Sequence, residues 1–145
     1  MKRLKWHKQE ASYSCVPACL KTVLEYYGIT ESEATLRIKC KSRAIGTHPL
    51  NAVECAKGYG LESYFDSVEL DELRSLLKAN IPPIVNIMIF DAEPPSLHSV
   101  ILTRITKRDV DVIDPESGRS KIPLHEFNQV WEAAEKTVIV IKKSS

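Results

Sequence analysis

The sequence lacks any long apolar run. Its longest, residues 81–90, contains two prolines and an asparagine, so it is too short and too interrupted to cross a bilayer as a helix. Residues 1–5 are basic, but no apolar segment of the length that a secretory signal needs follows them. We therefore expect a soluble, cytoplasmic chain, unless it is part of a larger membrane protein.

The sequence also lacks an excess of charge, since its formal net charge is +1. Nucleic-acid-binding proteins carry a basic surface, so we expect no nucleic-acid partner. The four cysteines, Cys15, Cys19, Cys40 and Cys55, are expected to be free thiols because the chain is long enough to bury a core without disulfides. Their spacing matches no zinc motif, and we expect neither a metal nor a cofactor.

Neither a repeat nor a linker divides the chain, so we expect a single domain over residues 1–145. Most predicted helices precede most predicted strands, which indicates an α+β fold with helices packed on an antiparallel sheet. Thr30 and Thr47 are predicted N-caps, Thr30 forming a capping box with Glu33. The predicted helices cover residues 17–27, 31–39, 49–58, 69–79 and 123–134, and the strands cover 61–66, 84–90, 99–105, 110–113, 119–122 and 137–141.

Cys15 is the best candidate nucleophile among the four cysteines. Pro17 favours the first turn of a helix, so Cys15 lies at or just before a helix N-terminus. A helix N-terminus lowers the pKa of a thiol, and the thiolate is the form that attacks a carbonyl carbon. Cys19 follows one turn deeper in the same helix and is assigned to the core. Cys40 and Cys55 lie in segments without such a terminus and are also assigned to packing.

His98 and Asp114 are the expected partners of this thiol. His98 directly precedes a buried strand, and Asp114 ends the next one. A hairpin that turns near residues 106–107 brings the start of the first strand beside the end of the second, so the two side chains meet. The imidazole would then act as the base and the carboxylate would orient it. Gln9 and the Cys15 backbone N–H are the expected donors to a developing oxyanion.

These residues resemble the peptidase C39 family. Residues 9–20, which include Gln9 and Cys15, look like the N-terminal motif of that family, residues 46–60 resemble its middle region, and residues 98–118 its C-terminal half. The resemblance implies a papain-like fold and peptide-bond hydrolysis through an acyl-enzyme on Cys15. By the same resemblance, Gln9 forms the oxyanion hole, His98 is the base and Asp114 is its partner.

The resemblance also implies a substrate and a setting. Many members are N-terminal domains of bacteriocin or peptide ABC exporters and remove leader peptides after a Gly-Gly pair on the cytoplasmic side of the membrane. The expected partners are therefore a peptide or protein substrate and exporter components. The expected place is the cytoplasm, or the membrane surface where an exporter holds the domain.

Two positions depart from the family pattern. Val16 replaces the glycine that usually follows the nucleophile, and Ser14 replaces an acidic residue. A β-branched side chain at Val16 could narrow the substrate groove. Two alternatives to a peptidase stay open at this point: a catalytically silent domain that binds a leader or partner, and another acyl-transfer enzyme on the same fold.

Overall fold

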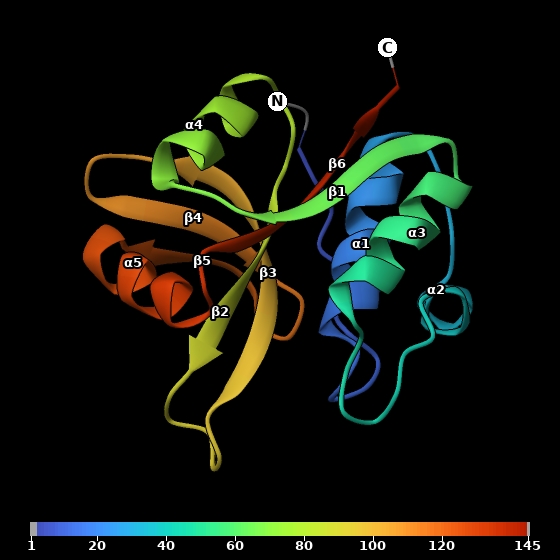
Figure 1. Ribbon diagram of the computed structural model, residues 1–145, viewed down its shortest axis with the longest axis horizontal. Helices are drawn as coiled ribbons and strands as arrows, with labels where there is room; N and C mark the ends of the chain where they lie inside the picture. The colour runs from blue at the N-terminus through green and yellow to red at the C-terminus, as the bar shows by residue number, and fades with distance from the viewer. Residues whose placement is uncertain (1–2, 145) are drawn as a thin grey trace.

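The computed structural model describes residues 3–144 and contains helices and strands in the mixed order expected of an α+β protein (Figure 1). The helices are α1 (Cys15–Tyr26), α2 (Glu33–Lys39), α3 (Pro49–Gly58), α4 (Leu70–Lys78) and α5 (Leu124–Ala133). The strands are β1 (Leu61–Ser67), β2 (Ile84–Ile89), β3 (Ser96–Ile105), β4 (Asp109–Asp114), β5 (Gly118–Pro123) and β6 (Thr137–Lys143).

The six strands form one sheet in the order β1-β6-β2-β3-β4-β5, and every neighbouring pair is antiparallel. The expected α+β class and antiparallel sheet are therefore confirmed. The strands β2 to β5 follow one another in both sequence and space, joined by short connections. β6, the last strand, inserts between β1 and β2, so it ties the helical half of the chain to the later strands.

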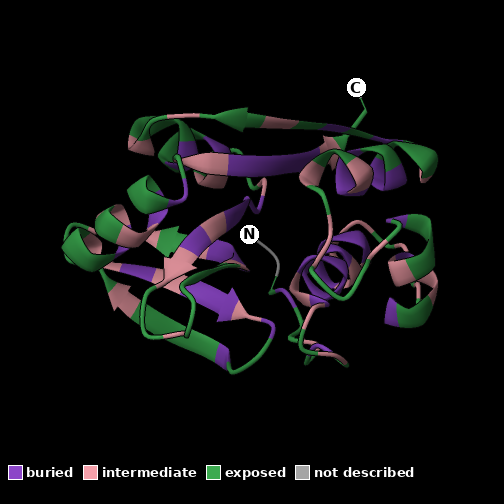
Figure 2. Ribbon diagram, turned by 60° about the horizontal axis from the view of Figure 1, so that its bottom comes forward, coloured by how far each residue is buried: buried purple, intermediate pink, exposed green. Residues whose placement is uncertain are grey.

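Helices cover both faces of the sheet and enclose two hydrophobic cores. One core lies between α1, α2, α3 and the sheet, and includes Leu20, Leu24, Ile84 and Ile101. The other lies beneath α4 and α5 and is centred on Phe127, whose ring stacks on that of Trp131. Figure 2 shows α1 as a mostly buried helix, in contrast to the exposed outer surfaces of the other helices. Neighbouring apolar residues of β2 and β3 point alternately into one core and the other, as expected for strands covered on both faces.

The helix starts differ in detail from the sequence prediction. α2 is capped by Ser32, whose hydroxyl accepts a hydrogen bond from the Thr35 N–H at 3.1 Å, and not by Thr30. α3 is capped by His48, whose Nδ1 accepts from the Leu50 N–H at 3.1 Å, and not by Thr47. The cap of α2 lies two residues after the predicted one, and the cap of α3 lies one residue after it. At α3 the capping atom is an imidazole nitrogen and not the expected hydroxyl oxygen.

The packing of α1 against β3 determines where the candidate site lies. The two elements are in direct contact, and the Cys19 thiol donates a hydrogen bond to the Ser99 carbonyl oxygen at 3.6 Å. The start of α1 therefore lies against the start of β3. Among residues 3–144, no helix combines the length and the apolar character that crossing a bilayer needs.

Candidate active site

Cys15 is the first residue of α1, as its position before Pro17 predicts. The turn that precedes the helix is closed by Ser14, which is fully buried. Its hydroxyl donates to the Ala11 carbonyl oxygen at 2.9 Å and accepts from the Ala11 N–H at 3.0 Å. Residues at a helix start have no intrahelical acceptor for their backbone N–H groups, so the Cys15 N–H is available to donate to another group.

His98 lies inside β3, two residues from its start, rather than before the strand. Its Nε2 donates a hydrogen bond to Asp114 Oδ1 at 2.7 Å. The register pairs Ile101 with Ile113, so Asp114 stands opposite Val100 and shares a face of the sheet with His98. Side chains on one face can meet across such a diagonal. The hairpin therefore brings these two residues together, as the sequence predicts.

The imidazole of His98 also lies beside the Cys15 thiol, close enough for each group to shift the pKa of the other. Because Nε2 is bound to Asp114, the nitrogen that faces the sulfur is Nδ1. Asp114 Oδ1 in turn accepts from the Glu116 N–H at 2.8 Å, which holds the carboxylate in place. Cys15 of α1, His98 of β3 and Asp114 of β4 thus lie together, with the imidazole between the thiol and the carboxylate.

The interactions among Cys15, His98 and Asp114 favour a thiolate paired with an imidazolium. Burial raises the pKa of the Cys15 thiol, but hydrogen bonds from His98 and Ser99 and the charge of His98 outweigh it, so the pKa lies below its ordinary value. Burial lowers the pKa of His98, but Asp114 and Cys15 together raise it to about 10. The pKa of Asp114, which burial raises, is lowered overall by its hydrogen bond to His98.

Gln9 is buried, with 7% of its surface exposed. Its side-chain Nε2 donates to the Ala11 carbonyl oxygen at 2.8 Å. An amide nitrogen carries two hydrogens, so one remains for another acceptor. The Oε1 atom of Gln9 is buried and has no hydrogen-bond partner among the described residues. A buried amide that is only partly satisfied is unusual and fits a group that completes its contacts when a ligand binds.

Two contacts hold the Gln9 segment against the rest of the site. The Gln9 N–H donates to the Pro115 carbonyl oxygen at 2.8 Å, next to Asp114. The neighbouring Glu10 N–H donates to both carboxylate oxygens of Glu33, at 3.0 Å and 3.2 Å. Glu33 is 1% exposed, and Arg37 lies 3.7 Å from its carboxylate. The sequence prediction used Glu33 for a capping box, but its carboxylate instead anchors the segment that carries Gln9.

The other three cysteines are buried free thiols. Burial raises the pKa of Cys19 well above its ordinary value, and the charges of Cys15 and Asp114 raise it further. Cys19 is therefore protonated where Cys15 is ionised. Among residues 3–144, no group of three or more histidine, cysteine or acidic side chains is arranged to hold a metal ion.

Val16, one of the two departures from the family pattern, is 6% exposed and packs in the core beneath α1. Its side chain therefore does not line a groove beside the Cys15 thiol. Ser99 was not singled out from the sequence, although it is buried and its carbonyl oxygen accepts from the Cys19 thiol on α1. The signal for Ser99 was a polar residue between His98 and the apolar run at residues 100–102 of β3.

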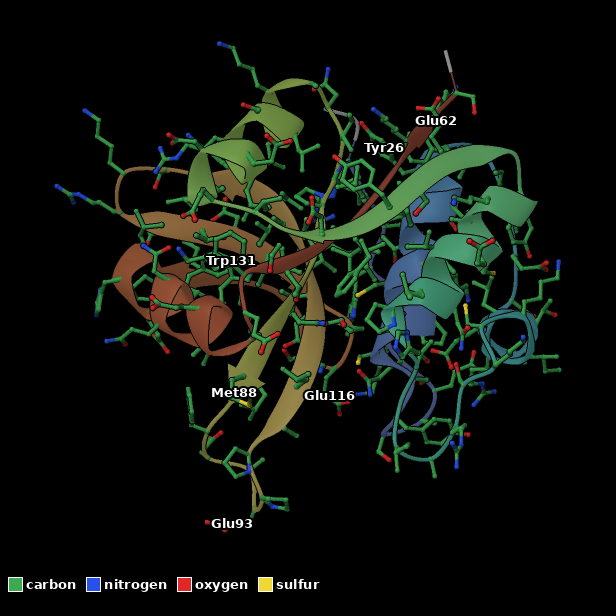
Figure 3. The ribbon with its side chains drawn as sticks, in the orientation of Figure 1. Tyr26, Glu62, Met88, Glu93, Glu116 and Trp131 are labelled. Atoms are coloured by element: carbon green, nitrogen blue, oxygen red, sulfur yellow. The ribbon has the colours of Figure 1, made fainter. Side chains whose placement is uncertain are left out.

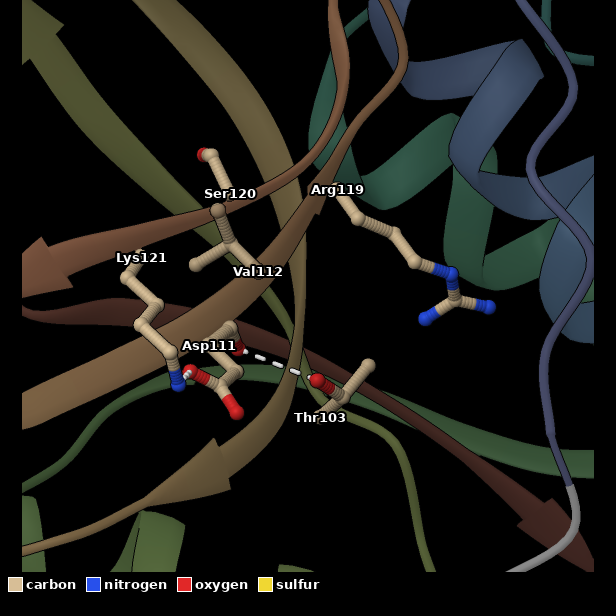
Figure 4. A pocket seen from close by; sticks show the side chains of 6 residues that line it. All are labelled: Thr103, Asp111, Val112, Arg119, Ser120 and Lys121. Carbon is tan, nitrogen blue, oxygen red and sulfur yellow. Dashed lines mark hydrogen bonds and ion pairs between the residues drawn. The ribbon is translucent and has the colours of Figure 1, made fainter.

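Two hollows lie on the sheet. One is lined by β3, β4 and β5 residues, where Thr103 donates to the Asp111 carbonyl oxygen at 3.3 Å and Lys121 pairs with the Asp111 carboxylate at 2.7 Å (Figure 4). None of the candidate site residues lines it. The other has Leu97, the residue before His98, and Asn86 in its wall, but none of the candidate site residues. Figure 3 shows Met88, also in that wall, at the end of β2, with Glu93 at the tip of the β2–β3 connection.

Comparisons with known proteins agree on one family. The model of the "Peptidase C39 family" matches residues 3–145. An "Uncharacterized protein" of Methanothermobacter thermautotrophicus is 27% identical over 135 residues, which are 93% of this chain and 86% of the relative.

Three solved structures share the fold. A double glycine motif protease from an AMS/PCAT transporter, in complex with its leader peptide, has a TM-score of 0.81 at 24% identity over 98% of this chain and 93% of that one. The peptidase domain of Streptococcus ComA, a bifunctional ABC transporter of a quorum-sensing pathway, gives 0.82 at 23% identity over 98% and 100%. A C39-like peptidase from Bacillus anthracis gives 0.82 at 16% identity over 99% and 96%. These similarities show the papain-like fold.

Proposed function

The chain belongs to the peptidase C39 family, and on this basis we propose that it is a cysteine peptidase, one domain over residues 1–145, that cleaves peptide bonds through an acyl-enzyme on Cys15. The observation that carries the proposal is the position of His98, whose Nε2 lies 2.7 Å from Asp114 Oδ1 and whose ring lies beside the Cys15 thiol. A sulfur nucleophile, a base and an acceptor that orients the base are the three groups that this chemistry needs.

The first half of the reaction follows from this arrangement. The Cys15 thiolate attacks the carbonyl carbon of the scissile bond, and the negative charge moves to the carbonyl oxygen. The Cys15 N–H and the second hydrogen of Gln9 Nε2 would donate to that oxygen. The His98 imidazolium then gives its Nδ1 proton to the leaving nitrogen, the C–N bond breaks, and the acyl group stays on sulfur.

The second half regenerates the thiol pair. His98, now neutral, accepts a proton from water as that water attacks the thioester carbonyl. The C–S bond breaks, the carboxylic acid leaves, and the proton on His98 restores the charged pair with Cys15. Asp114 keeps Nε2 protonated throughout, so Nδ1 is always the nitrogen that exchanges protons.

The leader of a secreted peptide, cut after a Gly-Gly pair, is the substrate that we propose. A double glycine motif protease with its leader peptide has the same fold, and an apolar hollow that contains Leu97, the neighbour of His98 in β3, together with Met88 and Phe65 lies on the sheet. Apolar side chains in such a hollow would bind apolar side chains of a peptide. We propose bacteriocin-type leader processing, with an ABC exporter as partner, at the cytoplasmic surface of the membrane.

Thiol reactivity gives the first test of this function. The native protein is treated with limiting iodoacetamide from pH 5 to pH 9, and the modified cysteine is identified by mass spectrometry. We expect Cys15 to react first and to react below pH 7, where ordinary thiols are protonated. In the His98→Ala variant, alkylation of Cys15 at neutral pH should slow. Equal reaction of Cys19, or reaction only in alkali, would remove the basis of the proposal.

Cleavage is tested with a synthetic leader peptide that ends in Gly-Gly before a short cargo, and with a matched peptide in which Ala-Ala replaces Gly-Gly. We expect hydrolysis of the first peptide after the second glycine, much slower hydrolysis of the second, and none by the Cys15→Ala variant. Binding of the leader without cleavage by the unmodified protein would instead identify a silent binding domain.

A further inference from the structure

Glu33 carries a buried carboxylate that has no part in the reaction described above. It is the first residue of α2 and is 1% exposed. The Ser32 hydroxyl already caps that helix, so the Glu33 carboxylate is not needed as a cap. A buried carboxylate lowers stability unless it is paired and hydrogen-bonded. The groups that it contacts therefore indicate its role.

Both carboxylate oxygens of Glu33 accept from one backbone group, the Glu10 N–H, at 3.0 Å and 3.2 Å. Arg37, one turn further along α2, places its Nε 3.7 Å from Glu33 Oε2, and its Nη2 donates to Glu10 Oε1 at 3.4 Å. The Glu10 side chain is 51% exposed and that of Glu33 is 2% exposed. The backbone contact is therefore the one that is shielded from solvent.

The Glu10 N–H belongs to the peptide group that joins Gln9 to Glu10. The peptide group on the other side of Gln9 is held as well, because the Gln9 N–H donates to the Pro115 carbonyl oxygen at 2.8 Å. Peptide groups are planar, so holding two successive ones fixes φ and ψ of the residue between them. These two angles set the direction in which the Gln9 side chain leaves the backbone. Glu33 therefore holds one of the two planes that determine this direction.

The amide at the end of the Gln9 side chain lies beside the turn that precedes Cys15. Its Nε2 donates to the Ala11 carbonyl oxygen at 2.8 Å, and the Ser14 hydroxyl donates to the same oxygen at 2.9 Å. One hydrogen of Nε2 then remains for another acceptor. The contacts from Glu33 to Gln9 and from Gln9 to Ala11 thus connect α2 to the start of α1.

We propose that Glu33 is a positioning residue for the oxyanion hole, which holds Gln9 in place by accepting from the Glu10 N–H. This inference rests on the proposed function, in which Gln9 donates to the oxyanion. The substrate carries no such charge before the attack, so a misplaced donor weakens binding of the transition state more than binding of the substrate. A misplacement of about 1 Å can lower a rate about 10²-fold. Loss of the Glu33 carboxylate should therefore lower kcat and leave KM unchanged.

The experiment measures kcat and KM for the synthetic Gly-Gly leader peptide in Glu33→Met, Glu33→Gln and Glu31→Met. Methionine favours a helix and is similar in length to glutamate, but it offers no oxygen to the Glu10 N–H, whereas glutamine keeps one. Glu31 accepts from the Tyr59 hydroxyl instead, so Glu31→Met is the matched control. We expect kcat to fall at least about tenfold in Glu33→Met, less in Glu33→Gln and not in Glu31→Met. KM should be the same in all.

A second comparison separates positioning of Gln9 from a general loss of structure. Glu33→Met is also made in the Gln9→Ala background. When Gln9 is absent, Glu33 has no donor left to position, so the kcat of the double variant should equal that of Gln9→Ala. Falls of equal size in both backgrounds would overturn the inference, because Glu33 would then act on the fold and not through Gln9. Circular dichroism and thermal melting establish that each variant is folded.

Hydrogen exchange supplies a readout that does not depend on activity. The Glu10 amide should exchange about tenfold faster in Glu33→Met, because it loses its acceptor. Unchanged exchange in the folded variant, or faster exchange with unchanged kcat, would overturn the inference. Should Glu33→Met fail to fold, Glu33→Gln is compared in the two backgrounds, with a smaller fall in kcat expected in the first and none in the second. The proposed function fails separately, when the unmodified protein does not cleave the leader.

Discussion

Replacing Asp114 by asparagine tests the electrostatic core of the site. Asparagine keeps an oxygen that can accept from His98 Nε2 at the 2.7 Å position and from the Glu116 N–H, but it removes the negative charge. The His98 and Asp114 side chains are 15% and 21% exposed, so solvent screens their interaction only in part. The change in the pKa of His98 on this substitution therefore measures what the negative charge of Asp114 contributes to that pKa.

The magnitude follows from the difference between two kinds of hydrogen bond. A hydrogen bond to a charged group contributes about 1.5–3 kcal/mol and a neutral one about 0.5–1.5 kcal/mol. The difference of about 1–1.5 kcal/mol corresponds to about one unit in the pKa of His98. Because a carboxylate stabilises the imidazolium, its removal lowers that pKa.

The assay is an NMR titration of the His98 ring from pH 5 to pH 11. It is done in a Cys15→Ala background, so that ionisation of the thiol does not overlap with that of the imidazole. We expect the pKa of His98 to be about one unit lower in Cys15→Ala/Asp114→Asn than in Cys15→Ala. Asp111→Asn, the same change on the same strand, is the matched control and should leave His98 unaffected. A fall of less than about 0.3 units in a folded protein would refute the reasoning.

Two further predictions concern Gln9 and Val16. Gln9→Ala should lower the kcat of leader cleavage about 10²-fold because it removes one oxyanion donor, while Gln129→Ala on α5 should not. The alkylation profile of Cys15 should stay the same in Gln9→Ala, and a shifted profile would show that Gln9 acts on the thiolate instead. Val16→Gly should lower the free energy of unfolding in urea by about 3 kcal/mol, from lost burial and helix propensity. Its KM for the leader peptide should not change, and a lower KM would mean that Val16 does narrow the groove.

Much of the site could be predicted from local sequence signals. Pro17 predicted the helix start, which the structure places at Cys15, and this position made Cys15 the candidate nucleophile among four cysteines. The spacing of His98 and Asp114 around a polar turn predicted that they meet, because antiparallel strands joined by a short turn bring the start of one beside the end of the other. Gln9 and the family resemblance came from the residue pattern alone.

The details that depend on contacts distant in sequence could not be predicted. The residues around Glu33 do not show whether its carboxylate caps a helix or accepts from the Glu10 N–H. The partner of this carboxylate depends on how α2 packs against the N-terminal segment. The outward or inward direction of Val16 likewise depends on which face of α1 meets the sheet.

The sequence by itself determined the types of groups, their order along the chain and the local elements that carry them, because helix starts and hairpin turns are decided by neighbouring residues. Only the tertiary structure decided that the start of α1 lies against β3, which brings the Cys15 sulfur to His98 and Ser99. The physical reason is that the shared core of α1 and the sheet, built from residues far apart in the chain, sets the distance between these side chains.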